Sequence, residues 1–192
     1  MNNIMGIDLS LRSTGISFNE QFELIQIEKL NDEELIIEIC KRICDLIEKF
    51  NPIEINLEGL SFNSISGSKD IIAGLFWNLR CKISQQFSNI KVNIIPVTTW
   101  RSPLFNKEDN KALKEGKKEF KLKKKSIKGL KGVDRKEAIE YNQILESKAN
   151  IKQYTFDKLP SHIKEKIINK TDGKGCYDLS DAYFISQYRK SI

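Results

Sequence analysis

The order of apolar segments along the first hundred residues constrains the fold more than any other feature of this chain. Three short apolar segments, Ile4–Leu9, Thr14–Phe18 and Phe22–Leu30, are separated by polar turn residues. Short apolar runs bounded by turn residues are typical of β-strands, and short connections favour antiparallel neighbours. The sequence therefore begins with a predicted antiparallel meander.

Helices and strands alternate in the next part of the chain. Apolar residues recur at helical spacing after Asn31 or Asp32, either of which is a suitable N-cap. The predicted segments are a helix over Asp32–Phe50, a strand over Ile53–Leu57, a helix over Asp70–Phe87 and a strand over Val92–Val97. Three antiparallel strands joined through helices to two more strands predict an α/β fold with a mixed five-stranded sheet and helices on both faces.

The pattern weakens from Trp100 to about Lys170, where one helix is predicted near Arg135–Lys148, and a final helix is predicted from Asp178 to about Arg189. A length of 192 residues suits one domain, here with a lysine-rich insertion at about 101–171.

Positive charge is concentrated in one stretch. Residues 101–131 hold twelve of the 32 basic residues and four of the 26 acidic ones, so the excess there exceeds the net charge of +6. The densest part, Lys117–Lys131, favours a surface that binds a polyanion, because lysines that neutralise phosphates release condensed counterions. A solvated, partly disordered lysine-rich loop is the alternative interpretation.

Composition argues against several other classes of protein. The single histidine, His162, disfavours Cys/His zinc sites and histidine-based triads, so any metal chemistry must depend on carboxylates. The four cysteines form no CxxC pair and suit reduced thiols in a cytosolic protein. No apolar run approaches the ~18 residues of a membrane span, and no secretory signal or transit peptide is visible.

Four acidic residues stand where they could serve chemistry or structure. Asp8 lies in a predicted buried strand, where its carboxylate needs compensation by a metal or by a turn bond to Ser10–Ser13. Glu58 follows a strand, at an edge where ligands collect in α/β sheets, but it is also a common exposed strand end. Asp178 and Asp181 share one face of a helix start, which a capping box would also explain.

The segments GIDLSLRSTGISF, LEG and DLSDA, in this order, resemble the RuvC family of Holliday-junction resolvases in the RNase H-like superfamily. The resemblance covers about 3–100 and 174–190 and is closer to phage-type members, whereas 101–171 departs from the family pattern. It implies an RNase H-like fold with three antiparallel strands and then two parallel ones. By motif, it implies that Asp8, Glu58, Asp178 and Asp181 are the catalytic and metal-binding residues.

The same resemblance implies a mechanism and partners. Two Mg²⁺ ions, with Mn²⁺ as a substitute, would lie ~3.5–4 Å apart and activate water for attack on a phosphodiester. The expected protein is a homodimer that uses the second helix and cuts four-way junctions and related branched DNA in recombination or repair. Its expected DNA contacts are Arg12, Phe62, Lys69, Arg80, Arg101, Lys117, Lys118, Lys123, Lys124, Lys125, Lys128 and Lys131.

Other functions remain open at this point. An RNase H-like nuclease could act instead on RNA–DNA hybrids, flaps or forks. GIDLSLRSTG also resembles the first phosphate-binding hairpin of actin-like and sugar-kinase-like ATPases, although no second Asp-x-Gly turn follows. A non-catalytic module that binds branched DNA is a third possibility, and participation of His162 or Asp172 in the site is undecided.

Overall fold

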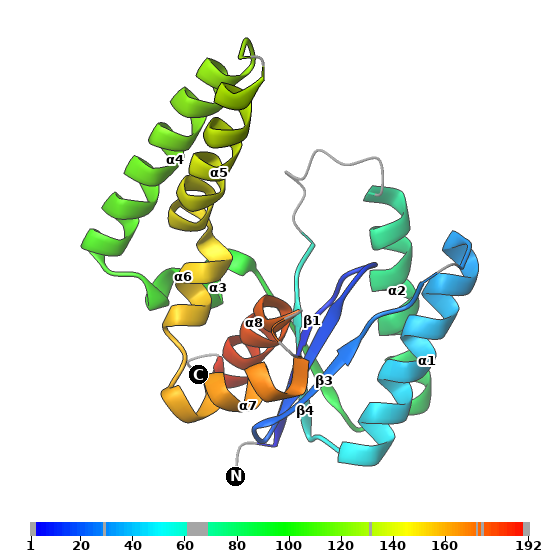
Figure 1. Cartoon of the computed structure of the whole chain (residues 1–192). Coiled ribbons are helices and arrows are strands. Elements are labelled where there is room, and N and C mark those ends of the chain that lie inside the picture. The colour runs from blue at the N-terminus through cyan, green and yellow to red at the C-terminus, as the bar shows by residue number, and fades with distance from the viewer. Residues whose placement is uncertain are drawn as a thin grey trace. The chain divides into compact units, whose positions relative to one another are not determined.

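A computed structural model of the chain describes residues 3–28, 30–60, 69–130, 132–171, 173 and 175–189. Its strands are β1 (Ile4–Asp8), β2 (Thr14–Phe18), β3 (Gln21–Ile25), β4 (Glu54–Glu58) and β5 (Lys91–Ile95). Its helices are α1 (Asp32–Phe50), α2 (Lys69–Gln86), α3 (Val97–Arg101), α4 (Lys107–Ile127), α5 (Val133–Ala149), α6 (Ile151–Asp157), α7 (Ser161–Thr171) and α8 (Cys176–Gln187), with a 3₁₀ turn, η1, at Ser102–Leu104 (Figure 1).

The five strands form one mixed sheet in the order β3-β2-β1-β4-β5. The pairs β1–β2 and β2–β3 are antiparallel, whereas β1–β4 and β4–β5 are parallel. Helices α1 and α2 cover one face, and α7 and α8 cover the other (Figure 1). The predicted fold class is therefore confirmed: three antiparallel strands followed by two parallel ones, as the RNase H-like resemblance implies.

The core lies between the sheet and helices α1 and α2. Side chains of β1, β2 and β4 that point to this face, among them Ile7, Ile16 and Leu57, are fully buried. They pack against apolar residues at helical spacing on α1, such as Ile43, and on α2, such as Leu79. Each such burial contributes about 1.5–3 kcal/mol relative to an exposed side chain.

Several boundaries differ from the sequence prediction. The third strand ends at Ile25 rather than continuing to Leu30, because its pairing with β2 ends where Thr14 faces Ile25. Asn31 is the cap of α1, since its side chain accepts a hydrogen bond from the Glu34 backbone. The lysine-rich stretch is not a loop: Lys107–Ile127 forms the long helix α4.

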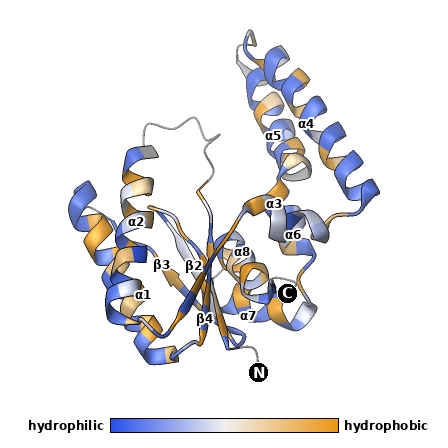
Figure 2. Ribbon diagram, turned by 180° about the vertical axis from the view of Figure 1, so that it is seen from behind, coloured by the Kyte–Doolittle hydropathy of each residue, from blue (hydrophilic) through white to orange (hydrophobic). Residues whose placement is uncertain are grey.

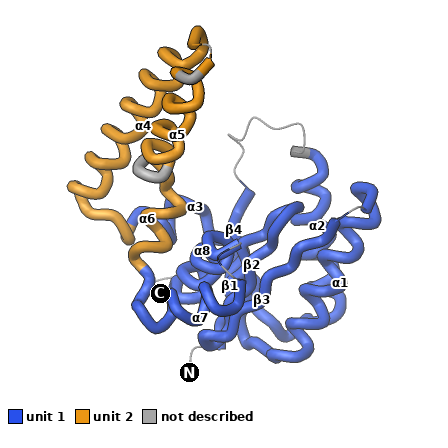
Figure 3. Tube along the Cα trace, viewed as in Figure 1, with its two compact units in different colours: residues 1–102, 159–192 blue, residues 103–158 orange. Residues whose placement is uncertain are grey.

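The chain divides into two compact units, residues 1–102 with 159–192 and residues 103–158 (Figure 3). The first unit contains the sheet, α1–α3, α7 and α8. The second contains α4, α5 and α6, and its small core includes Leu113 and Leu145. Helix α7, within the stretch predicted as an insertion, therefore belongs to the unit that contains the sheet. In the described part of the chain, no helix is long and apolar enough to cross a lipid bilayer.

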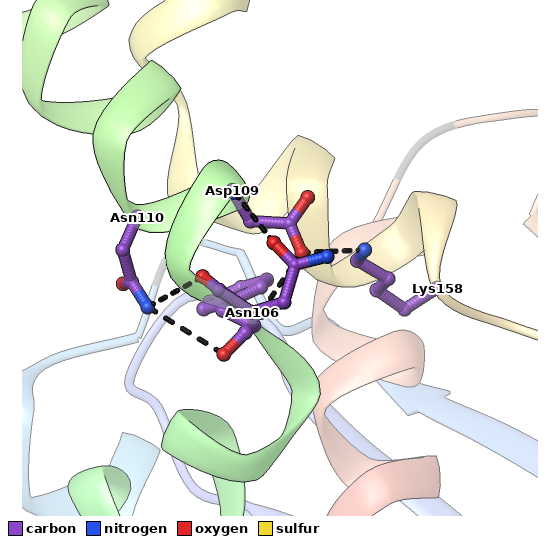
Figure 4. A network of polar contacts seen from close by, with 5 residues as sticks. Asn106, Asp109, Asn110 and Lys158 are labelled. Atoms are coloured by element: carbon purple, nitrogen blue, oxygen red, sulfur yellow. Dashed lines mark hydrogen bonds and ion pairs between the residues drawn. The ribbon is translucent and has the colours of Figure 1, made fainter.

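A polar network connects the start of α4 to the residue that follows α6 (Figure 4). Asn106 and Asp109 form a capping box at the start of α4. The Lys158 ammonium donates to Asp109 Oδ2 at 2.7 Å, and the Asn110 side-chain amide donates to the Asn106 carbonyl at 2.9 Å. Sequence neighbours at the start of α4 are thereby tied to the residue that follows α6.

Candidate acidic site at the end of the sheet

Strand register brings Asp8 and Glu58 to the same end of two neighbouring strands. Strands β1 and β4 are parallel, with Ile7 opposite Leu57, so Asp8 and Glu58 are the next residues on each strand. Parallel neighbours lie about 4.8 Å apart, and side chains alternate between faces. Gly6 and Asn56, two residues earlier, both face α8. Asp8 and Glu58 therefore point toward the α8 face.

Helix α8 carries the other two acids and lies directly on this face. Gly15 pairs with Asp8 across the β1–β2 ladder, and a Cβ at Gly15 would collide with the backbone of Asp178. A Cβ at Gly6 would likewise collide with the backbone of Ala182 and Ser186. These two glycines allow α8 to approach the sheet closely, which places Asp178 beside the strand residue next to Asp8.

Asn56 fixes the other end of α8. It is fully buried in β4, and its side-chain amide donates to the carbonyl oxygens of Ile185 and Tyr188, both at 2.9 Å. Its own Oδ1 accepts a hydrogen bond from Asn93 at 3.0 Å. The last carbonyls of a helix lack the full set of partners within the helix, so these two hydrogen bonds from Asn56 hold the end of α8 against β4. The sequence analysis did not single out Asn56, although a polar residue inside an apolar strand is a signal that could have indicated this role.

The short helix α3 connects two of the acids through adjacent residues. The Trp100 indole Nε1 donates to Glu58 Oε2 at 3.1 Å. The Arg101 guanidinium binds Asp181 Oδ2 at 2.8 Å, and its centre lies 4.4 Å from the centroid of the Trp100 ring. No local sequence signal identified Trp100, because its partner lies 42 residues earlier in the chain.

The structure also tests the capping-box explanation of Asp178 and Asp181. The N-cap of α8 is Gly175, with no side-chain cap bond, so the capping box suggested for Asp178 and Asp181 is wrong. Asp181 lies in the second turn of the helix and is 1% exposed. The turn after β1 is held by Ser10 and Thr14: the Thr14 hydroxyl donates to the Ser10 carbonyl at 2.7 Å.

We call Asp8, Glu58, Asp178 and Asp181 the acidic site. By chemistry, four carboxylates suit hard divalent cations, which prefer oxygen ligands. Among the described residues, however, no three or more Asp, Glu, His or Cys side chains are grouped as ligands of one ion. The Glu58 carboxylate accepts a hydrogen bond from Trp100, and the Asp181 carboxylate forms an ion pair with Arg101. An ion bound at Asp181 Oδ2 would therefore replace Arg101 at that oxygen.

His162 lies at the other end of the sheet. It stands on α7, where its Nε2 is 3.4 Å from Glu20 Oε1. Glu20 follows β2, whereas Gly15, the neighbour of Asp8, is near the start of that strand. His162 is therefore not part of the acidic site. Asp172 lies outside the described residues.

The residues expected to contact DNA are found in different settings. Arg12 is exposed in the turn after β1, and Arg80 is half-buried on α2 with its guanidinium 4.5 Å from the Trp77 ring centroid. Arg101 is mostly buried in its ion pair with Asp181. Phe62, Lys131 and the side chain of Lys69 lie outside the described residues. The other expected contacts are exposed on or directly after α4: Lys117, Lys118, Lys123, Lys124, Lys125 and Lys128.

Most lysines of α4 lie on one face of the helix. Leu113 and Gly116 are buried where α4 packs on α5, and the opposite side of the helix is hydrophilic along most of its length (Figure 2). At 100° per residue, seven exposed lysines fall on this outer side, the last of them directly after the helix. This lysine stripe consists of Lys107, Lys111, Lys114, Lys118, Lys121, Lys125 and Lys128.

Comparison with solved structures gives a likeness in fold. No protein-family model matches the chain, and no curated protein matches it. Among solved structures, T. thermophilus RuvC in complex with a Holliday junction substrate is similar, with 12% sequence identity and a TM-score of 0.44. The match covers 53% of this chain and 70% of that one.

Proposed function

We propose that this chain is a metal-dependent, structure-selective endodeoxyribonuclease that cuts four-way junctions and related branched DNA. The observation that carries the proposal is the meeting of acid-bearing elements on one face of the sheet: β1 and β4 end side by side, and α8 lies against Gly15, the partner of Asp8. Four carboxylates from three separate elements, brought together at the ends of β1 and β4, would suit the hydrolysis of a phosphodiester with divalent ions.

The residues of the chain have separable roles in this proposal. Asp8, Glu58, Asp178 and Asp181 would hold Mg²⁺, or Mn²⁺ in its place. Bound ions would supply an activated water and stabilise the charge that develops on the phosphate and the leaving oxygen. Asn56 and the glycines of β1 and β2 keep α8 in position, and no side-chain nucleophile is needed.

The lysine stripe supports DNA as the substrate. Its members repeat at intervals of three or four residues, so they form a row of positive charge along the outer side of α4. Lysines in such a row neutralise backbone phosphates without reading base sequence, which suits an enzyme selected for the shape of its substrate.

We further propose that two copies associate through α2. Trp77 is 57% exposed on this helix, while its neighbours Leu75 and Leu79 are buried in the core. Trp77 and Phe76 also line a largely apolar hollow of about 630 Å³ that includes Ile94. A two-fold dimer matches a substrate with two equivalent strands to cut. Sedimentation velocity of the purified chain should give the mass of a dimer, and a monomer across the concentrations used for cleavage would contradict this proposal.

The test of the function uses a synthetic four-way junction with Mg²⁺ and compares the wild-type chain with Asp8→Asn. We expect paired, symmetric nicks from the wild type and their loss in the variant, because the amide removes a negative ligand at the centre of the acidic site. Junction binding, measured by gel shift in Ca²⁺, should be retained. Equal nicking by both proteins would refute the assignment.

The substrate class is tested in the same assay. Linear duplex, flaps, forks and an RNA–DNA hybrid are compared with the junction at equal concentration. Preferential cutting of the hybrid by the wild type, lost in Asp8→Asn, would keep the nuclease site and replace the proposed substrate. Junction binding without cleavage in any divalent ion would instead indicate the non-catalytic module.

A further inference from the structure

Two adjacent residues of α3 bind two members of the acidic site. Trp100 is 3% exposed and donates to Glu58, and Arg101 binds Asp181. These acids come from β4 and α8, elements separated by more than a hundred residues in the chain. Helix α3 therefore joins the strand and the helix that carry them, by one hydrogen bond and one ion pair.

The ion pair is buried and well held. The side chain of Arg101 is 13% exposed and that of Asp181 is 1% exposed. The guanidinium carbon also lies 4.4 Å from the centroid of the Trp100 ring, a cation–π contact that helps to hold the side chain in place. A carboxylate this deeply buried needs a positive partner, because an isolated buried charge is strongly unfavourable. Arg101 is that partner in the metal-free protein.

We propose that Arg101 is a built-in counter-ion of the acidic site that competes with a divalent cation for Asp181. The inference rests on the proposed function in one respect: it takes the acidic site as the place where the cation binds. A cation that reached Asp181 Oδ2 would meet the guanidinium that now binds this oxygen. Repulsion between two positive charges at short range lowers affinity for the cation.

Competition has two consequences for the protein. Arg101 keeps the carboxylates of the metal-free site from repelling one another, which stabilises the metal-free fold. It also raises the cation concentration at which the site fills. Removing the guanidinium should therefore weaken the metal-free protein and tighten cation binding, two opposite effects from one substitution.

Trp100 provides a readout that does not depend on cleavage. The chain has two tryptophans, and the substitution Trp77→Phe leaves Trp100 as the only one. Because its indole binds Glu58, its fluorescence should change when a cation takes that carboxylate. Ca²⁺ is the probe, since it is a hard cation that prefers oxygen ligands.

The experiment titrates Ca²⁺ into Trp77→Phe alone and combined with Arg101→Gln, Arg101→Lys or Arg42→Gln. Arg42 is a matched control: it is an exposed arginine paired with Glu38 on α1, across the sheet from the acidic site. We expect the Arg101→Gln midpoint to fall about tenfold or more, because the competing charge is gone. Arg101→Lys should give a smaller decrease, and Arg42→Gln should leave the midpoint unchanged.

Thermal unfolding monitored by circular dichroism completes the design. Without Ca²⁺, Arg101→Gln should melt below its parent, and Ca²⁺ should raise its Tm more than that of the parent. If Arg101→Gln does not fold without the cation, Ca²⁺-induced folding gives its midpoint, and Arg101→Lys gives an independent one.

Equal midpoints for the parent and both Arg101 variants would overturn the competition but leave the nuclease proposal intact. No response to Ca²⁺ in fluorescence or Tm for any variant would instead remove the metal site on which the proposed function depends.

Discussion

Single atoms decide how closely α8 approaches the sheet. At Gly15, the Cβ of any other residue would collide with the Asp178 backbone, and at Gly6 it would collide with Ala182 and Ser186. Backbone atoms cannot move aside as a flexible side-chain end can. The positions of Asp178 and Asp181 relative to Asp8 therefore depend on the absence of a Cβ at two strand positions.

The substitution Gly15→Ala tests this dependence. The methyl group should push the first turn of α8 away from β2, so we expect loss of about 1–3 kcal/mol of unfolding free energy from overpacking. Nicking should fall further than stability explains, because Asp178 moves away from Asp8. Urea unfolding and the junction assay measure the two effects in the folded protein.

Gly74→Ala is the matched control for this prediction. Gly74 lies in α2, where a Cβ would make only an ordinary contact with Ile36. Alanine is favoured over glycine in a helix interior, so stability should stay equal or rise by about 0.4–1 kcal/mol. If Gly15→Ala behaves like Gly74→Ala in both assays, the close approach of α8 does not position the acids.

At the scale of elements, sequence periodicity was sufficient for the sheet, α1 and α2 and insufficient for α3. Alternating and helical apolar patterns predicted β1 to β5, α1 and α2, because each element buries one face against the same core. The role of α3 could not be predicted, since Trp100 and Arg101 find their partners 42 and 80 residues away. Arg101 was interpreted as a phosphate contact because it adjoins a basic stretch, whereas its guanidinium binds Asp181.

Helix α4 was missed for a different reason. It buries few residues on a single partner helix, so its apolar periodicity is weak, although Asn106 and Asp109 have the spacing of a capping box. In that box, the hydrogen bond from Lys158 is the main cause that lowers the pKa of Asp109, and the backbone N–H of Asn106 lowers it further. The start of α4 is thus linked to the protonation of one carboxylate.

A pH dependence follows from this lowered pKa. At pH values above 3.8, the ordinary pKa of aspartate, Asp109 is ionised and stabilises the second unit. This contribution is lost as the pH falls below that value and through the lower pKa of the folded state. We expect amide exchange at the start of α4, corrected for intrinsic rates, to accelerate relative to α1 as the pH falls below about 4. Asp109→Asn should accelerate exchange at neutral pH and remove this additional acid response; an unchanged acid response would assign it to another group.

At the scale of the whole molecule, we expect one unit to carry out the chemistry and the other to bind the substrate. The acidic site lies entirely in the unit that contains the sheet, and the lysine stripe lies entirely in the unit of 103–158. Phosphate contacts contribute affinity that depends strongly on salt, whereas under the proposed function cation binding at the carboxylates would set the rate of cleavage. Substitutions in the two units should therefore affect different measured quantities.

Lys118→Gln with Lys125→Gln tests this division. These two lysines lie seven residues apart on the stripe and are exposed. We expect weaker junction binding and a less steep dependence of log K on log salt, by about 0.9 for each phosphate that is no longer neutralised. At saturating enzyme the cleavage rate should stay close to that of the wild type, because the acidic site is unaltered.

The control Lys41→Gln with Lys82→Gln removes the same charge from α1 and α2 and should leave the salt slope unchanged. Equal slopes for both double variants would show that net charge, rather than the stripe, governs binding; an unchanged slope with a slower cleavage rate would instead give these lysines a role in the chemical step.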